Sequence, residues 1–255
     1  MDISNQIALV TGGGSGLGEA TARHFAHLGA KVAIFDLDQK RADAVASDIN
    51  GISIKTDVGD EANVEAGFSA IVKALGSAPR IVVNCAGIGP AARIVGREGK
   101  LSTELFARTL QINLMGTYFV MSHGARAMQG LAPMNDDGER GVVINTASVA
   151  WEDGQLGQSA YSASKGAIAS LCLPVAREFA QTGIRVMTIA PGLFHTPMME
   201  GLPEETTAKI TANIPYPARL GKASEYARLA SDIVANPFLN GTTIRLDGAV
   251  RLPPR

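Results

Sequence analysis

Short apolar runs alternate with helical patterns along the whole chain. The apolar runs are rich in Val, Ile and Ala and cover residues 7–11, 31–36, 52–56, 81–84, 141–146, 185–189 and 242–246. Nearly continuous apolar runs are typical of parallel strands that are covered on both faces. Helical patterns cover residues 16–28, 38–49, 61–75, 103–129, 159–181 and 224–235. The alternation predicts one α/β domain over residues 1–255, with a doubly wound parallel sheet and helices on both faces.

Two segments interrupt this alternation. Residues 131–140 are polar and rich in turn formers, which predicts a surface loop. The stretch 192–221 is longer and combines four prolines with many apolar residues. Long connections inside compact domains are often lids, so we expect a substrate-binding lid at about 193–220, with a helix that caps the sheet as the alternative.

The charge of the chain is nearly balanced. Its 23 Lys and Arg residues face 24 Asp and Glu residues, for a net charge of −1. A nucleic-acid binder would carry a basic excess, so we expect a small-molecule substrate and no nucleic-acid partner. Cys85 and Cys172 lie in apolar runs, which predicts buried thiols in a reducing compartment and no metal site. With neither a targeting segment nor an apolar run near ~20 residues, we expect a cytoplasmic protein without membrane contact.

A glycine-rich turn lies between the first strand and the first helix. Gly12, Gly16 and Gly18 are spaced as T-G-x-x-x-G-x-G, with Ser15 and Leu17 between them. Glycines allow a tight turn and let backbone N–H groups approach a pyrophosphate at the helix N-terminus. Turns use glycine in any case, so a turn without a ligand is the alternative. The position between strand and helix favours dinucleotide binding by all five residues.

Asp36 ends the second strand, eighteen positions after Gly18. A carboxylate there accepts hydrogen bonds from the adenosine ribose hydroxyls and repels a 2′-phosphate. No cation adjoins it, and Lys40 and Arg41 are interpreted as solvated helix charges. The cofactor is therefore expected to be NAD rather than NADP. The alternative is that Asp36 caps the helix that begins near Asp38.

Further candidates for cofactor contact follow the third and fourth strands. In an open parallel sheet, ligands bind outside the carboxyl ends of the strands. Asn84 is also compatible with a plain turn. The residues at these two strand ends are Asp57, Val58, Asn84, Ala86 and Gly87.

Ser148, Tyr161 and Lys165 form the strongest candidate for chemistry. Tyr161 and Lys165 are four residues apart, so both lie on one helix face. An ammonium there favours the phenolate, which predicts a tyrosine pKa below its usual value of ~10 and a proton donor that works near neutrality. The Ser148 hydroxyl is placed to stabilise a developing oxyanion. Each residue alone is compatible with an ordinary loop or surface position, but together they predict an acid–base site.

Asn113 lies in the middle of a long helical stretch, where asparagine is a mediocre residue. Its side chain is interpreted as the holder of a water that links Lys165 to solvent. A local hydrogen bond or a small kink is the alternative.

The chain resembles the short-chain dehydrogenase/reductases over essentially its whole length. The resemblance rests on the glycine turn, the 84–87 stretch, Asn113, Ser148, the Tyr161–Lys165 pair and the Pro191–Gly192 dipeptide. It implies a Rossmann-type sheet of seven strands, a catalytic tetrad of Asn113, Ser148, Tyr161 and Lys165, and a homotetramer. It also implies that a cluster after the sixth strand contacts the nicotinamide end of the cofactor. That cluster is Pro191, Gly192, Phe194 and Thr196.

Within that family, four stretches resemble the branch that oxidises 3-hydroxyacyl-CoA thioesters and some hydroxysteroids with NAD. These stretches are 154–161, 185–194, 236–241 and 244–249. Animal members of that branch carry a mitochondrial N-terminal segment, and no such segment is visible in this chain, so we expect a bacterial cytoplasmic enzyme.

The expected reaction is the oxidation of an L-3-hydroxyacyl-CoA to the 3-oxoacyl-CoA. Arg93, Arg97 and Lys100 are candidates for holding the CoA phosphates, with a solvated loop as the alternative. A hydroxysteroid or other secondary-alcohol dehydrogenase is the second hypothesis, and a non-catalytic scaffold subunit is the third. The predicted substrate contacts, polar and apolar, are Gln155, Gln158, Leu156, Phe194, Met198, Met199 and Leu202.

Overall fold

A computed structural model describes residues 1–196 and 211–254. Its main feature is a seven-stranded parallel sheet in the order β3-β2-β1-β4-β5-β6-β9. The strands are β1 (Ile7–Thr11), β2 (Lys31–Asp36), β3 (Ile52–Lys55), β4 (Ile81–Asn84), β5 (Gly141–Thr146), β6 (Ile184–Pro191) and β9 (Thr243–Leu246). All seven predicted strands are present, and β6 is longer than expected. The predicted α/β class and the Rossmann-type sheet are confirmed.

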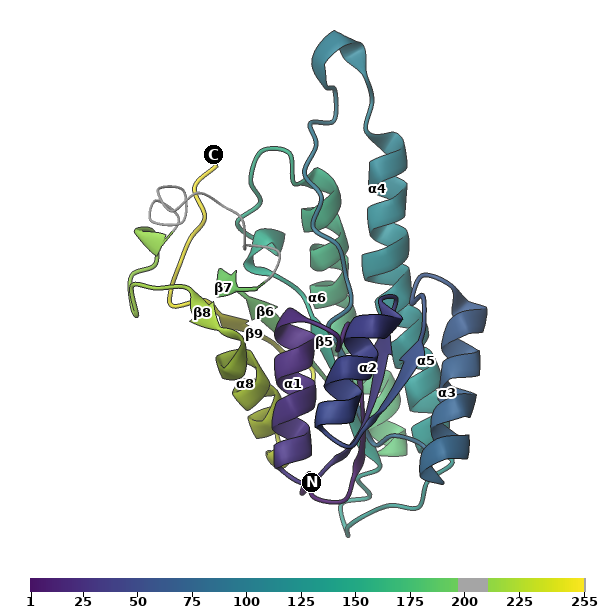
Figure 1. The fold of residues 1–255 in the computed structure, drawn as a ribbon. Helices are drawn as coiled ribbons and strands as arrows, with labels where there is room; N and C mark the ends of the chain where they lie inside the picture. Colours follow the sequence, from purple (N-terminus) through teal and green to yellow (C-terminus); the bar gives the residue numbers. More distant parts are fainter. Residues whose placement is uncertain (197–210, 255) are drawn as a thin grey trace.

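Helices cover both faces of this sheet, as Figure 1 shows. One layer consists of α1 (Gly16–His27), α2 (Gln39–Asp48) and α8 (Ala223–Ala235), whose apolar side chains share one core. The opposite layer is built from α3 (Glu61–Leu75), α5 (Gly116–Gln129) and α6 (Ser159–Phe179). Local signals fix several ends: Asp38 and Asp60 cap α2 and α3, and Gly76 ends α3 in the left-handed conformation.

Successive residues of each strand serve the two cores in turn. In β1, Ala8 and Val10 face the layer of α1 and α8, whereas Ile7 and Leu9 face the layer of α3 and α5. Because side chains alternate across a strand, a sheet covered on both faces needs apolar residues at every position. This is why the strands appear in the sequence as continuous apolar runs.

The predicted helix over 103–129 is interrupted. It consists of α4 (Thr103–Leu110), a π-helical turn η2 (Gln111–Met115) and α5. Single π turns insert one extra residue into a helix and are frequent at functional sites. The turn contains Asn113, so the kink that was the alternative account of this residue is present.

Other connections differ from expectation. A parallel two-residue ribbon pairs β7 (Phe194–His195) with β8 (Gly221–Lys222), and the sequence gave no signal for it. Residues 131–140 form a loop as predicted, but Glu139 at its end is buried and pairs with Arg185. The thiols of Cys85 and Cys172 are free, yet only Cys172 is buried as predicted. No helix in the described part of the chain is long and apolar enough to cross a membrane.

Three 3-10 turns complete the described elements. The turn η1 (Arg97–Gly99) lies in the 88–102 segment, which Figure 1 shows running beside α4 above the sheet. Val95 and Leu101 form an antiparallel bridge across that turn. The turn η3 (Val149–Trp151) follows β5, η4 (Ala180–Thr182) follows α6, and the segment ends where α4 begins.

Candidate active site

The predicted site residues gather at the carboxyl edge of the sheet. In the seven-stranded sheet, β2 and β3 lie on one side of β1, and β4, β5, β6 and β9 lie on the other side. The order therefore reverses between β1 and β4, and ligands of open α/β sheets bind at such a switch point. The Thr11 hydroxyl accepts hydrogen bonds from the N–H groups of Cys85 (3.1 Å) and Ala86 (3.0 Å), which joins the two strand ends.

The glycine turn has the shape that a dinucleotide requires. Gly12 adopts a left-handed φ of 64°, and a Cβ there would lie 3.0 Å from the backbone of Ala86. Gly18 allows α1 to approach the turn, because a Cβ at Gly18 would lie 2.2 Å from the carbonyl oxygen of Gly12. Ser15 is the N-cap of α1 but its side chain makes no capping bond. The first N–H groups of α1 have no partner within the helix, so they suit a pyrophosphate.

Asp36 lies beside this turn. Its Oδ2 accepts from the N–H of Gly14 (2.9 Å) and its Oδ1 from the N–H of Asp38 (2.9 Å). Asp38, not Asp36, caps α2, so the alternative reading of Asp36 as a helix cap is wrong. A carboxylate that is fixed next to the pyrophosphate turn keeps lone pairs for ribose hydroxyls.

The other residues near the turn divide into two groups. Leu17 packs partly against the core, and Val58 is buried against Gly116, so these two side chains serve packing. Asp57 is exposed and accepts from the N–H of Gly59 (2.9 Å).

Asn84 does not point outward. Its amide is buried within the sheet and donates to Oδ1 of Asn145 (2.9 Å) on β5. The side chain of Asn84 therefore joins β4 to β5, and the expected contact of this segment with the cofactor stays a prediction. The backbone just after it lies at the site, because a Cβ at Gly87 would lie 3.8 Å from Nζ of Lys165.

Lys165 and Tyr161 lie together on α6. The ammonium of Lys165 is 5.8 Å from the ring centre of Tyr161 and donates to the carbonyl of Thr146 (2.7 Å). Burial lowers the pKa of Lys165 to about 8, against a smaller opposite effect of Cys85. Burial also raises the pKa of Tyr161, and a hydrogen bond with Ser148 opposes that rise. The predicted lowering of the Tyr161 pKa by Lys165 is therefore not found, because desolvation of the phenol decides the direction.

Ser148 lies between β5 and η3. Its side chain is buried and its Oγ accepts from the N–H of Ala150 (3.2 Å), which caps the 3-10 turn. An accepting hydroxyl keeps its own proton for donation. Ser148 is therefore held in place by the turn and retains a donor for an oxygen above Tyr161.

Asn113 uses its amide for protein contacts. Its Oδ1 accepts from the N–H of Ile88 (2.8 Å), and its Nδ2 donates to the carbonyl of Ile88 (2.9 Å) and to Ser164 Oγ (3.0 Å). Both amide protons of Asn113 are thus used within the protein. This geometry supports the alternative in which Asn113 makes local hydrogen bonds. Ser164 in turn donates to the carbonyl of Tyr161 (2.7 Å). Sequence reasoning missed Ser164, although it lies inside the Tyr161–Lys165 motif.

The residues predicted to contact the substrate lie in different environments in the structure. Gln155 turns away from the site and donates to the carbonyl of Pro253 (3.0 Å), and Gln158 accepts from the N–H of Gln155 (3.3 Å). The C-terminal segment takes up the amide of Gln155, so this side chain has another partner than the expected substrate; the substrate contacts of Gln155 and Gln158 stay predictions. Leu156 is exposed, whereas Phe194 is buried against Gly221 and lines a small cavity of about 120 Å³ together with Ile214 and Leu246. Three predicted contacts, and most of the predicted lid, lie outside the described residues: Met198, Met199 and Leu202.

The cluster after β6 lies at the same carboxyl edge. Pro191 is the buried last residue of β6, and the N–H of Gly192 donates to the carbonyl of Leu246 (2.9 Å). Thr196 is partly exposed. Gly192 and Thr196 therefore border the edge where the turn and Tyr161 also lie.

A cationic cavity of about 630 Å³ opens between the 88–102 segment and α4. Arg93, Arg97 and Lys100 line it as a group, together with Arg108 of α4, which sequence reasoning missed. The segment begins at Ile88, which Asn113 holds next to Lys165. In the described ranges, no cluster of His, Cys, Asp or Glu could hold a metal ion.

Comparisons with known proteins agree with this geometry. The profile of the family described as short chain dehydrogenase matches residues 6–207. The chain is 44% identical over 99% of its length to the Drosophila melanogaster protein named 3-hydroxyacyl-CoA dehydrogenase type-2, covering 100% of that protein. It is 45% identical to the Homo sapiens protein of the same name, covering 97% of it and 99% of this chain.

Two solved structures are also similar. The 3-hydroxyacyl-CoA dehydrogenase type-2 from Mycobacterium avium has a TM-score of 0.91 at 40% identity, with 97% of this chain and 96% of that chain covered. The 3-ketoacyl-(acyl-carrier-protein) reductase from Brucella melitensis, complexed with NADH, has a TM-score of 0.84 at 27% identity. Coverage there is 98% of this chain and 100% of that chain.

Proposed function

The chain belongs to the short-chain dehydrogenase family, and from that premise we propose that it interconverts an L-3-hydroxyacyl-CoA and the 3-oxoacyl-CoA with NAD. The observation that carries the reaction type is the meeting of Ser148, Tyr161 and Lys165 with the glycine turn at one edge of the sheet. The thioester substrate is supported by the relatives named 3-hydroxyacyl-CoA dehydrogenase type-2.

Two residues handle the substrate oxygen in this proposal. Ser148 donates a hydrogen bond to the carbonyl oxygen and stabilises the charge that develops on it. Tyr161 gives the oxygen its proton during reduction and takes a proton from the alcohol during oxidation. NAD, when bound, supplies or accepts the hydride at the carbon atom. Because burial raises the pKa of Tyr161, the phenol is protonated near neutral pH and suits the reductive direction there.

Lys165 has two tasks in this scheme. It keeps one N–H on the carbonyl of Thr146 and has two donors left for ribose hydroxyls of the cofactor. Its charge, close to the Tyr161 ring, stabilises the phenolate that forms when the proton leaves. Asn113 holds the Ile88 backbone and, through Ser164, the helix turn that carries both residues.

Asp36 supports NAD as the cofactor. Its carboxylate is fixed beside the pyrophosphate turn, where a 2′-phosphate would meet a like charge. Gly12, Gly16 and Gly18 hold the pyrophosphate with the N–H groups of α1, and Gly192 and Thr196 contact the nicotinamide end.

The cationic cavity supports a CoA thioester. Three arginines and one lysine surround a space that is large enough for a phosphorylated group, and Arg108 lies five residues before Asn113 along the helix. At 1.5 Å per residue, this places Arg108 about 7.5 Å along the axis from the π turn. A long substrate with its carbonyl at Tyr161 could therefore place its phosphates among these cations.

Steady-state kinetics test the substrate. We expect kcat/KM for acetoacetyl-CoA with NADH to exceed that for CoA-free ketones and ketosteroids. Preference for a CoA-free ketone by orders of magnitude would instead favour a hydroxysteroid or secondary-alcohol dehydrogenase. Tyr161→Phe should lose nearly all turnover while it still binds NADH. Wild-type protein that binds NADH but turns over no ketone would favour a non-catalytic subunit.

We also propose a cytoplasmic homotetramer. Support comes from exposed apolar side chains on the long helices: Phe106 on α4, Tyr118 on α5 and Leu173 on α6. Large apolar side chains on neighbouring surfaces mark interaction sites. Light scattering after size-exclusion chromatography should give a mass of four chains.

A further inference from the structure

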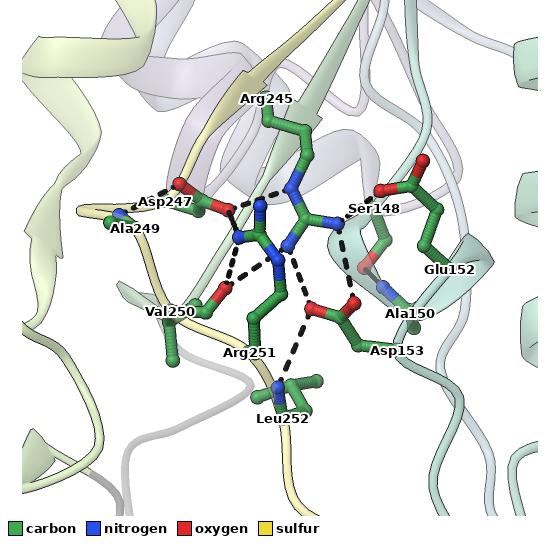
Figure 2. A network of polar contacts seen from close by, with 10 residues as sticks. All are labelled: Ser148, Ala150, Glu152, Asp153, Arg245, Asp247, Ala249, Val250, Arg251 and Leu252. Atoms are coloured by element: carbon green, nitrogen blue, oxygen red, sulfur yellow. Dashed lines mark hydrogen bonds and ion pairs between the residues drawn. The ribbon is translucent and has the colours of Figure 1, made fainter.

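The loop that links Ser148 to Tyr161 is tied to the C-terminal segment of the chain. Figure 2 shows Glu152 and Asp153 of this loop turned toward Arg245 of β9, with Ser148 just behind them. The side chain of Asp153 points toward Arg245 and the backbone of Leu252. None of the roles proposed above uses these contacts.

Arg245 is the centre of this network. Its Nη2 donates to Oδ2 of Asp153 (2.7 Å) and its Nη1 donates to Glu152. The same guanidinium donates through Nε to Asp247 (2.8 Å) and through Nη2 to the carbonyl of Val250 (3.1 Å). The side chains of Arg245, Asp153 and Asp247 are 16%, 10% and 9% exposed, so water competes little for these bonds. One cation therefore bridges the catalytic loop, β9 and the C-terminal segment.

Backbone contacts extend the connection. The amide of Gln155 donates to the carbonyl of Pro253 (3.0 Å), and the N–H of Leu156 donates to the carbonyl of Pro254 (3.0 Å). The N–H of Leu252 adds a bond to Asp153 (3.4 Å). The segment 250–254 thus lies along the loop 152–158 as a strap.

The strap is coupled to Ser148 by a short, bonded turn. The N–H groups of Glu152 and Asp153 both donate to the carbonyl of Val149, the residue after Ser148. At its other end, the loop enters α6 at Ser159, two residues before Tyr161. Asp153 therefore lies between the two reacting residues in the chain, five positions after Ser148 and eight before Tyr161, and is bonded to the residue that follows Ser148.

The charges explain why Arg245 is required. Burial would raise the pKa of Asp153, but the guanidinium of Arg245 holds it below its ordinary value, so the carboxylate is charged at neutral pH. Without Arg245, the carboxylates of Glu152, Asp153 and Asp247 would face each other. The charge of Arg251 also lowers the pKa of Asp153, but the hydrogen bonds of Arg251 in the described part of the chain go to Asp247 and Val250 and not to the loop. Partly buried like charges repel, so the loop would move away from β9.

We propose that Arg245 is a positioning residue of the reaction: by clamping the 152–158 loop to the C-terminal segment, it fixes Ser148 relative to Tyr161. The inference rests on the dehydrogenase activity proposed above, but not on the identity of the acyl substrate. The glycine turn and Asp36, which are proposed to hold the adenosine and the pyrophosphate, lie on β1, α1 and β2, outside this clamp. Gly192 at the nicotinamide end lies against Asp247, but most of the cofactor contacts, and therefore most of the NADH affinity, should not depend on Arg245.

Three variants test the clamp against one control. Arg245→Met removes the cation, Arg245→Lys keeps the charge without the planar fork, and Asp153→Asn removes the charge on the loop side. Arg251→Met is the matched control, because Arg251 belongs to the same cluster but contacts only Asp247 and Val250. Each is assayed for kcat and KM with acetoacetyl-CoA and NADH, and for NADH affinity by fluorescence titration.

A misplacement of about 1 Å can cost about 10²-fold in rate. We expect Arg245→Met and Asp153→Asn to lower kcat by about 10- to 100-fold, Arg245→Lys to recover part of the loss, and Arg251→Met to behave as wild type. NADH affinity should stay within twofold throughout. If Arg245→Met does not fold, Asp153→Asn decides. A folded Arg245→Met or Asp153→Asn with kcat near wild type overturns the proposal, as does an equal loss in Arg251→Met.

The proposed substrate is judged separately, on the wild-type protein. If acetoacetyl-CoA is not reduced but another ketone is, the thioester assignment fails and the Arg245 comparison is made on that ketone. The proposed role of Arg245 is then still decided by comparing the kcat values of the Arg245, Asp153 and Arg251 variants.

Discussion

Gly18→Ala should separate the cofactor turn from helix α1. A Cβ at Gly18 would lie 2.2 Å from the carbonyl oxygen of Gly12 and 2.6 Å from its carbon, whereas ordinary contacts begin at 3.4 Å. Helix and turn must therefore move apart by 1.2 Å (3.4 − 2.2). Both contacting atoms are backbone, so no side-chain rotation relieves the clash.

The expected magnitudes follow from that displacement. Overpacking of this kind costs about 1–3 kcal/mol of folding free energy. The same movement shifts the N–H groups of the first turn of α1 away from the pyrophosphate. We expect the NADH dissociation constant to rise about 10- to 100-fold, which corresponds to about 1.4–2.8 kcal/mol.

Two matched alanine substitutions separate packing from binding. Gly67→Ala also creates a clash, 2.5 Å from the buried ring of Phe35, but it lies on α3, away from the turn. It should lower the melting temperature and leave NADH affinity unchanged. Gly166→Ala meets no atom within 4 Å in α6, so it should stabilise the protein by about 0.5–1 kcal/mol.

Fluorescence titration with NADH and thermal unfolding measure both effects. Gly18→Ala should lose stability and affinity together. If it lost stability as Gly67→Ala does, yet bound NADH within twofold of wild type, the glycine turn would not be the cofactor site. Unchanged stability would refute the close contact itself.

Three further substitutions test other parts of the structure. Asp36→Ala should erode the preference for NAD over NADP, and an unchanged ratio of the two kcat/KM values would contradict the role of this carboxylate. Lys165 has a pKa of about 8, so its ammonium is present below that pH and is lost above it; NADH affinity should fall by up to about tenfold per pH unit above 8. Lys165→Arg, which stays charged, should remove this pH dependence, whereas the same fall in that variant would exclude Lys165 as its cause. Arg185→Met leaves the buried carboxylate of Glu139 with the amino terminus of Met1 as its charged partner (3.3 Å), so the free energy of unfolding in urea titrations should fall by about 3 kcal/mol, the lower end of the cost of breaking a buried pair; a loss below about 1 kcal/mol would show that the Arg185–Glu139 pair contributes little.

The sequence predicted the strands well, because each strand of a doubly covered sheet must be apolar at every position. The same reasoning located Gly12, Gly18, Asp36, Tyr161 and Lys165, since strand ends and helix starts follow directly from the order of elements. These residues needed no knowledge of distant contacts. Their placement depends on local chain geometry and on the switch between β1 and β4.

Predictions that depend on distant partners were less successful. Gln155 was expected in the pocket, but the amide is taken by Pro253, almost one hundred residues later. The side chain of Asn84 on β4 bonds to Asn145 on the neighbouring strand β5. No signal near Asn84 in the sequence distinguishes this buried side chain from one that points out of the sheet edge. The pKa of Tyr161 was predicted to be lowered, but burial raises it. The sequence reveals the nearby charge of Lys165 but not how deeply the phenol is buried.

The ribbon of β7 and β8 makes the connection between its strands exchangeable. It pairs Phe194 with Gly221 and His195 with Lys222, and 25 residues (196–220) separate the two strands in the sequence. The chain therefore leaves the ribbon and returns to it at adjacent points. The entropy of joining two adjacent points by a flexible connection grows only with the logarithm of its length, so each doubling costs about 0.6 kcal/mol. Insertions between the two strands should therefore leave β5, β6 and α6, and with them Tyr161, in place.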